Sequence, residues 1–113
     1  MEIALINTRN PQQKIIVDKL PTIIGRDAGV EVPLQDAWVG GYHCMLDWEG
    51  ETLAVLDLGS RTGTFVNGAR VRKARLMAGD ILTVGRTNLA VHYESVEPLA
   101  AALAPSQGST DWN

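Results

Sequence analysis

The chain has 113 residues, of which 45% are hydrophobic and 20% are charged, and its formal net charge at pH 7 is -3. This length and composition fit one small globular domain that can bury a core without disulfides, and the single cysteine, Cys44, excludes an internal disulfide. No apolar run approaches the ~20 residues of a membrane span, and the amino-terminal stretch does not resemble a signal peptide. We therefore expect a soluble, cytoplasmic protein.

Short segments of β-type sequence follow one another along the chain. They cover residues 2–6, 14–18, 22–25, 43–48, 52–58, 64–66, 70–71, 81–84 and 88–93. Turn residues separate several of them, namely Gly50, the Asn67-Gly68 pair and Gly85, at positions typical of hairpins. No amphipathic helix is evident before Val96. The pattern predicts an all-β fold, an antiparallel β-sandwich of about 11 short strands.

The composition changes after Glu97. Residues 98–113 are rich in Ala, Pro, Ser and Gly, and they lack apolar periodicity. We predict a β-sandwich domain over residues 1–97, followed by a flexible tail or linker over residues 98–113.

Charge is distributed unevenly along the chain. Residues 27–57 contain seven acids and no Lys or Arg, whereas residues 61–86 contain six bases and one acid. The basic cluster at residues 70–75 could attract nucleic acid. However, the whole chain is acidic and no aromatic residue is interleaved with the cluster for base stacking, so we favour a solvated hairpin with alternating charges.

Residues 59–68, with the sequence Gly-Ser-Arg-Thr-Gly-Thr-Phe-Val-Asn-Gly, combine turn residues with hydrogen-bond donors. Gly63 and the Asn67-Gly68 pair enclose only three residues, which predicts a very short strand between two tight turns. Residues 59–62 are then displayed at a strand end. Their hydroxyl and guanidinium groups suit an anionic or amide-rich ligand.

Together with residues upstream, this stretch resembles the forkhead-associated (FHA) domain, a phosphothreonine-peptide recognition module. The family pattern is Gly-Arg, then Ser-x-x-His, then Asn-Gly-Thr, then Asn-Gly. The matching positions, in the same order within residues 3–94, are Gly25-Arg26, His43, Gly63-Thr64 and Asn67-Gly68. The resemblance implies an FHA/SMAD-like β-sandwich that binds a phosphothreonine-containing segment of a partner protein.

The resemblance also implies roles for individual residues. Arg26 would contact the phosphate, and its guanidinium suits bidentate binding; the alternative is an ion pair with Asp27 or another acid. His43 would brace the binding loop rather than touch the ligand. The other residues that would support the loops are Gly25, Gly63, Asn67 and Gly68.

The chain departs from the family pattern at three positions. Gly40 and Gly41 replace a Ser and the basic or amide residue after it, and Thr62 replaces an Asn. Losing two hydrogen bonds to a charged group could cost ~3–6 kcal/mol of binding free energy. The N–H groups of both glycines could form an anion-binding nest, and Arg61 could replace a phosphate contact. Alternatively, the two glycines merely permit a tight loop.

The predicted phosphopeptide site therefore consists of Arg26, Gly40, Gly41, Arg61 and Thr62. We predict weakened phosphothreonine recognition, with a degenerate module that binds its partner without phosphate as the alternative. Nucleic-acid binding by residues 70–75 is a third interpretation. The sequence contains no nucleophile elbow, P-loop or spaced set of metal ligands, so we expect neither an enzyme nor a cofactor or metal site.

Overall fold

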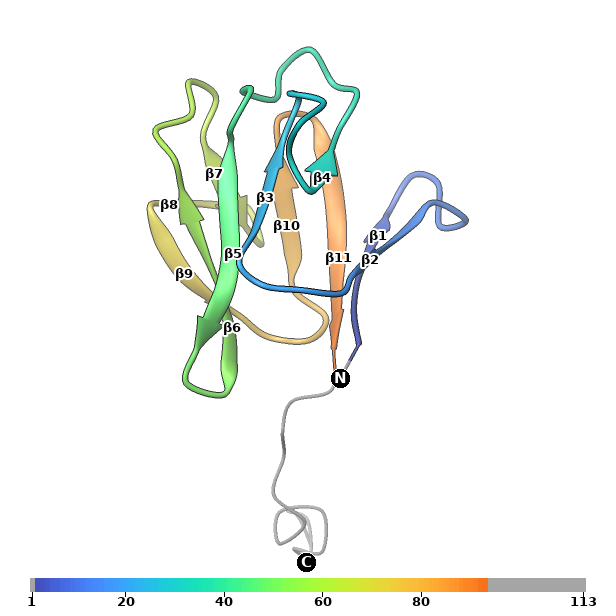
Figure 1. The fold of residues 1–113 in the computed structure, drawn as a ribbon, viewed down its shortest axis with the longest axis vertical. Helices are drawn as coiled ribbons and strands as arrows, with labels where there is room; N and C mark the ends of the chain where they lie inside the picture. Colours follow the sequence, from blue (N-terminus) through green and yellow to red (C-terminus); the bar gives the residue numbers. More distant parts are fainter. Residues whose placement is uncertain (1, 94–113) are drawn as a thin grey trace, which may run out of the picture.

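The structure is a computed structural model that describes residues 2–93. In this range, eleven strands form two sheets packed face to face, and there is no helix (Figure 1). The six-stranded sheet has the order β2-β1-β11-β10-β7-β8 and consists of β1 (Ile3–Asn7), β2 (Lys14–Val17), β7 (Thr64–Val66), β8 (Ala69–Val71), β10 (Ile81–Val84) and β11 (Thr87–Tyr93). The five-stranded sheet has the order β4-β3-β5-β6-β9 and consists of β3 (Thr22–Gly25), β4 (Val32–Pro33), β5 (Cys44–Glu49), β6 (Thr52–Asp57) and β9 (Lys73–Leu76). The predicted β-sandwich of about 11 strands is confirmed.

The core lies between the two sheets and follows from the alternation of side chains along each strand. In β11, Leu89 and Val91 are fully buried while His92 is exposed on the outer face. In β5, Cys44 and Leu46 point into the core, and burial raises the pKa of the Cys44 thiol to about 12. Cys44 is thus a small core residue without the reactivity of an exposed thiol.

The Asn67-Gly68 pair forms the tight turn that the sequence predicted at this position. Asn67 and Gly68 join β7 to β8 with φ angles of 51° and 86°, a left-handed pair that non-glycine residues rarely adopt. The Asn67 side chain accepts a hydrogen bond from the Ile81 N–H at 2.9 Å and donates one to Asp80 at 3.0 Å. This turn therefore also ties β7 to the start of β10.

Two strands and one pairing differ from the sequence prediction. The very short β4 and the cationic β9 were not among the predicted segments. In addition, β3 pairs with β4 in parallel, whereas the other paired strands within residues 2–93 are antiparallel.

The predicted basic hairpin at residues 70–75 is wrong. The chain passes from one sheet to the other at Arg72, so β8 and β9 do not pair with each other. Arg70 therefore belongs to a different sheet from Lys73 and Arg75. The latter two make ion pairs with Glu49 at 3.4 and 3.8 Å. The basic residues thus do not form one continuous stripe.

Four loops meet at one end of the sandwich, the upper end in Figure 1. They join β3 to β4, β4 to β5, β6 to β7, and β10 to β11. The predicted tail and its boundary near residue 97 lie outside the described residues. Within residues 2–93 no helix is long and apolar enough to cross a bilayer.

Candidate functional site

A recess between these loops brings together residues that are distant in the sequence. Its lining consists of Arg26, Ala37, Trp38, Val39, Gly40, Arg61 and Thr62. We call it the Arg26 recess. Four of the five residues predicted to bind a phosphopeptide line it, and the fifth, Gly41, is exposed directly beside Gly40.

Arg26 follows the last residue of β3, so its side chain leaves the sheet where the loops begin. Its backbone N–H donates to the Gly40 carbonyl at 2.9 Å, and its guanidinium donates to the Ala37 carbonyl at 3.3 Å. Among residues 2–93 the only ion pairs are those of Glu49, so the alternative in which Arg26 pairs with an acid is not observed. Most of the Arg26 guanidinium donors remain available to a ligand.

Gly25 allows the β4–β5 loop to cross the end of β3. A Cβ atom at this position would lie 2.0 Å from the Gly41 carbonyl oxygen, which no side chain could tolerate. The Asp27 N–H also donates to the Gly41 carbonyl, at 3.2 Å. The glycine therefore lets two loops join by backbone hydrogen bonds at the edge of the Arg26 recess.

His43 is fully buried and connects the β4–β5 loop to the β6–β7 loop. Its Nδ1 accepts the Gly40 N–H at 2.9 Å, and its Nε2 lies 2.8 Å from the Gly63 carbonyl oxygen. Because Nδ1 accepts, Nε2 carries the proton and donates to that carbonyl. This geometry supports the bracing role implied by the FHA resemblance.

The two glycines of the β4–β5 loop differ in what they offer to an anion. The Gly40 N–H is already bound to His43, so the prediction that both N–H groups form a nest is wrong for Gly40. Gly41 N–H has no hydrogen-bond partner among the described residues. Neither glycine has a positive φ, and a Cβ would be 3.7 Å from His43 at position 40 and free of contacts within 4 Å at position 41. The tight-loop alternative is therefore not required, because the backbone accepts side chains at both positions.

Thr62 and Arg61 come from the β6–β7 loop. The Thr62 hydroxyl donates to the Trp38 carbonyl at 2.8 Å, so it fastens this loop to the β4–β5 loop. Arg61 is exposed and has no ion pair within the described part of the chain. Two guanidinium groups without a carboxylate partner, those of Arg26 and Arg61, thus line one recess.

Asp57 organises the β6–β7 loop, a role that was not predicted from the sequence. Its carboxylate accepts hydrogen bonds from the hydroxyls of Ser60 and Thr64 at 2.5 and 2.7 Å, and from the N–H groups of Gly59 and Ser60 at 3.0 and 3.1 Å. Partial burial alone would raise the pKa of Asp57, but these hydrogen bonds outweigh it and lower the pKa below its usual value. The spacing of Asp57, Gly59 and Ser60, typical of an Asx-type turn, was the available signal.

Asp36 has a similar role in the β4–β5 loop and was also missed. Its carboxylate accepts from the Trp38 N–H at 2.8 Å, and from the Arg86 N–H and the Thr87 hydroxyl, both at 2.8 Å. The Arg86 guanidinium carbon lies 5.1 Å from the centre of the Trp38 ring, a cation–π contact. The exposed Trp38 ring is thereby held in place beside the Arg26 recess.

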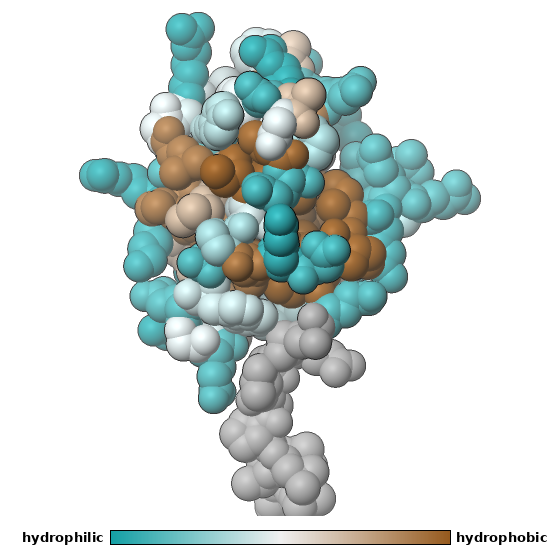
Figure 2. Space-filling view, in the orientation of Figure 1, coloured by the Kyte–Doolittle hydropathy of each residue, from teal (hydrophilic) through white to brown (hydrophobic). Residues whose placement is uncertain are grey.

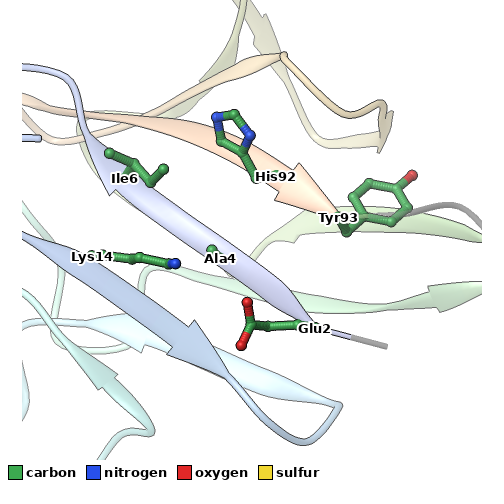
Figure 3. Close-up of a pocket in the computed structure, with 6 residues that line it drawn as sticks. All are labelled: Glu2, Ala4, Ile6, Lys14, His92 and Tyr93. Carbon is green, nitrogen blue, oxygen red and sulfur yellow. The ribbon is translucent and has the colours of Figure 1, made fainter.

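Other surface features lie apart from the Arg26 recess. On the face shown in Figure 2, apolar patches are interrupted by hydrophilic side chains. A hollow on the outer face of β1, β2 and β11 is lined by Glu2, Ala4, Ile6, Lys14, His92 and Tyr93 (Figure 3). It contains none of the residues singled out by the FHA pattern. Within residues 2–93 no group of three or more His, Cys, Asp or Glu side chains could hold a metal ion.

Comparison with known proteins agrees with this arrangement of loops. The family model of the FHA domain matches residues 22–85, more than half of the chain. The chain belongs to the FHA family. FHA domains are binding modules rather than enzymes, and the resemblance noted in the sequence is confirmed.

Two curated relatives are mycobacterial proteins. The FHA domain-containing protein FhaA of Mycobacterium tuberculosis is 35% identical over 69 residues, which cover 61% of this chain and 13% of FhaA. The glycogen accumulation regulator GarA of Mycolicibacterium smegmatis is 32% identical over 80 residues, which cover 71% of this chain and 51% of GarA. This FHA domain thus spans about half of GarA and a small part of FhaA.

Solved FHA domains have the same fold. An FHA domain solved in a study of phosphothreonine-dependent FHA domain interactions superposes on this domain with a TM-score of 0.77. The two are 26% identical, and the match covers 85% of this chain and all of the other. The FhaA FHA domain, in complex with the intracellular domain of Rv3910, gives a TM-score of 0.73 at 28% identity, covering 80% of this chain and 99% of that one.

Proposed function

We propose that this FHA domain binds a phosphothreonine-containing segment of a partner protein at the Arg26 recess. The observation that carries the proposal is the pair of guanidinium groups, from Arg26 and Arg61, that line one recess without a carboxylate partner in residues 2–93. A phosphate with a charge of about -1.5 to -2 suits two guanidinium groups and a nearby free N–H, which Gly41 supplies. Phosphothreonine-dependent binding by a related FHA domain supports this assignment.

We further propose that the affinity is weaker than a complete FHA pattern would give. Gly40 has no side chain, and its N–H is bound to His43. The Thr62 hydroxyl donates its hydrogen to the Trp38 carbonyl, so only its oxygen, as an acceptor, is free for a peptide. Hydrogen bonds to a charged group contribute about 1.5–3 kcal/mol each, so the missing donors lower the affinity by at least about tenfold.

Because phosphorylation of threonine is a regulatory modification, we propose that this domain acts in signalling and that it is located in the cytoplasm.

A phosphate-independent protein interaction is the second candidate. The β4–β5 loop, which borders the Arg26 recess, carries two large aromatic side chains that are exposed to solvent. Trp38 is 51% exposed and Tyr42 is 57% exposed. Exposed aromatic residues are common anchors in protein interfaces. A partner could dock on them without any phosphate.

A binding comparison separates the two candidates. A degenerate phosphothreonine peptide library selects the tightest sequence, which is then titrated in phosphorylated and unphosphorylated form. We expect binding only by the phosphorylated peptide, and loss of that binding in Arg26→Ala. The control Arg72→Ala removes an exposed arginine outside the Arg26 recess and should bind as the wild type does. Equal affinity for both peptides, unaffected by Arg26→Ala, would establish the phosphate-independent alternative.

A further inference from the structure

A second recess is linked to the Arg26 recess by a contact between one lining residue of each. Its lining consists of Arg9, Thr83, Arg86 and Asn88, and we call it the Arg9 recess. Arg86 packs over the ring of Trp38, which itself lines the Arg26 recess. The Trp38–Arg86 pair therefore connects the two recesses at the loop end of the sandwich.

Backbone hydrogen bonds hold the β1–β2 hairpin next to β11. The Thr8 N–H donates to the Asn88 carbonyl at 3.0 Å, and the Arg9 N–H donates to the Asn7 side chain at 2.9 Å. The turn that carries Arg9 is thus fixed against the strand that carries Asn88. This arrangement places two arginines from opposite ends of the domain sequence, Arg9 and Arg86, around one recess.

The side chains of the Arg9 recess are rich in donors. The Thr83 hydroxyl donates to Asn88 Oδ1 at 2.6 Å, which fixes the amide and leaves the Asn88 Nδ2 donor without an acceptor in residues 2–93. Neither Arg9 nor Arg86 forms an ion pair with any of the described residues. The Asp36 carboxylate accepts the Arg86 backbone N–H and interacts with the Arg86 charge, but it also accepts hydrogen bonds from Trp38 and Thr87 and does not line the Arg9 recess. Two guanidinium groups and an amide donor, with no acid in the lining, suit a phosphate.

We infer that the Arg9 recess is a second phosphate site, so that this domain binds a doubly phosphorylated segment. One phosphate binds at the Arg26 recess and the other at the Arg9 recess, with the chain between them passing the Trp38–Arg86 pair. The inference rests on the proposed function, because the first phosphate must bind as proposed there. Two linked contacts bind more tightly than either alone when the linker spans both sites, so the spacing between the two phosphates sets the preferred partner.

The main experiment compares singly and doubly phosphorylated peptides by fluorescence anisotropy. A second phosphothreonine is placed two to six residues from the first, on either side, because an extended chain rises about 3.3 Å per residue. At least one spacing should bind about tenfold more tightly than the singly phosphorylated peptide. Arg9→Gln should remove this gain, whereas Lys14→Gln, which loses the same charge from the same hairpin but outside the Arg9 recess, should keep it.

The outcomes distinguish the inference from the proposed function. If the singly phosphorylated peptide binds but no second phosphate adds affinity, or if the gain persists in Arg9→Gln, the second site is overturned and the proposed function stands. If no phosphopeptide binds, the proposed function fails, and binding of a doubly phosphorylated partner fails with it.

A titration with inorganic phosphate tests the Arg9 recess without any peptide. In ¹H–¹⁵N spectra we expect saturable shifts of the Asn88 side-chain amide and of the Arg9 Nε–H in the wild type. The Asn88 shift should be lost in Arg9→Gln and kept in Lys14→Gln. Absence of these shifts in the wild type overturns the second site, whatever the peptides do.

Discussion

Single residues decide how well the Arg26 recess can hold a phosphate. Gly25 is required by the close approach of the Gly41 carbonyl, whereas Gly40 and Gly41 stand where side chains would fit. The site thus contains one glycine that the fold needs, at the end of β3, and two that it does not, in the β4–β5 loop. The difference lies in the space around each Cβ position and is not visible in the sequence alone.

Side chains restored at positions 40 and 41 should strengthen binding. Gly40→Ser with Gly41→Arg is expected to increase the affinity for a phosphothreonine peptide by at least about tenfold, because one added charge-assisted hydrogen bond contributes about 1.5 kcal/mol or more. Calorimetric titration measures the change. Ala28→Arg is the control, because it adds the same charge at an exposed position of the neighbouring β3–β4 loop. Equal gains in both proteins would mean that net charge alone is responsible.

At the level of elements, hairpin turns and loop networks hold the strands and the recess in place. The β7–β8 turn needs two left-handed residues, and Asn67 and Gly68 supply them. The β6–β7 loop depends on Asp57, whose carboxylate accepts four hydrogen bonds from Gly59, Ser60 and Thr64. Each element can therefore be tested by one substitution.

Gly68→Val should destabilise the fold. The φ angle of 86° at Gly68 is strained for a β-branched residue, so we expect a loss of about 1–2 kcal/mol or more in the free energy of unfolding. Ala69→Val, at the next exposed position of β8, should change stability little, because valine suits a strand. Urea denaturation of both variants provides the comparison. Equal stability of the two would show that the turn tolerates side chains.

Asp57 should make stability depend on acid. In the folded state the pKa of Asp57 lies below its usual value of 3.8. The ionised carboxylate therefore stabilises the folded state fully above about pH 4, and this contribution to the free energy of unfolding is lost as the pH falls through the lowered pKa. Asp57→Asn should cost about 1–3 kcal/mol at pH 7, since it weakens or breaks hydrogen bonds to a carboxylate, and the difference from the wild type should shrink toward pH 2.

The measurement for Asp57 is urea denaturation at pH 7 and at several values between 4 and 2. Asp18→Asn serves as the control, because Asp18 is exposed and accepts no side-chain hydrogen bond among residues 2–93. A constant difference between wild type and Asp57→Asn across this range would contradict the role of the ionised carboxylate.

At the scale of the whole molecule, the sequence predicted the sandwich because buried strands alternate apolar and polar residues and glycines punctuate the turns. It missed β4 because two residues give no periodicity. It missed β9 because Arg72, Lys73 and Arg75 give this segment a cationic, loop-like composition. Charged side chains on an edge strand are nevertheless a common way to protect a sheet edge from pairing with another chain.

The candidate site was predictable only in part. Arg26 and His43 were found through the FHA resemblance, and Arg61 through its place in a donor-rich loop. The contacts of Asp36 with Arg86 and Thr87 join residues 50 and 51 positions apart, so they depend on how the loops meet in space. The Trp38–Arg86 contact, and with it the Arg9 recess, could not be derived from local sequence patterns for the same reason.

The most direct test of the account follows backbone and side-chain N–H groups during a peptide titration. ¹⁵N-labelled protein is titrated with the selected phosphothreonine peptide and with its unphosphorylated twin. We predict that the phosphorylated peptide produces its largest shifts at the Gly41 amide and at the Nε–H groups of Arg26 and Arg61, and that the twin leaves them unchanged. Equal shifts with both peptides, or shifts confined to the outer faces of the sheets, would contradict phosphate recognition at the Arg26 recess.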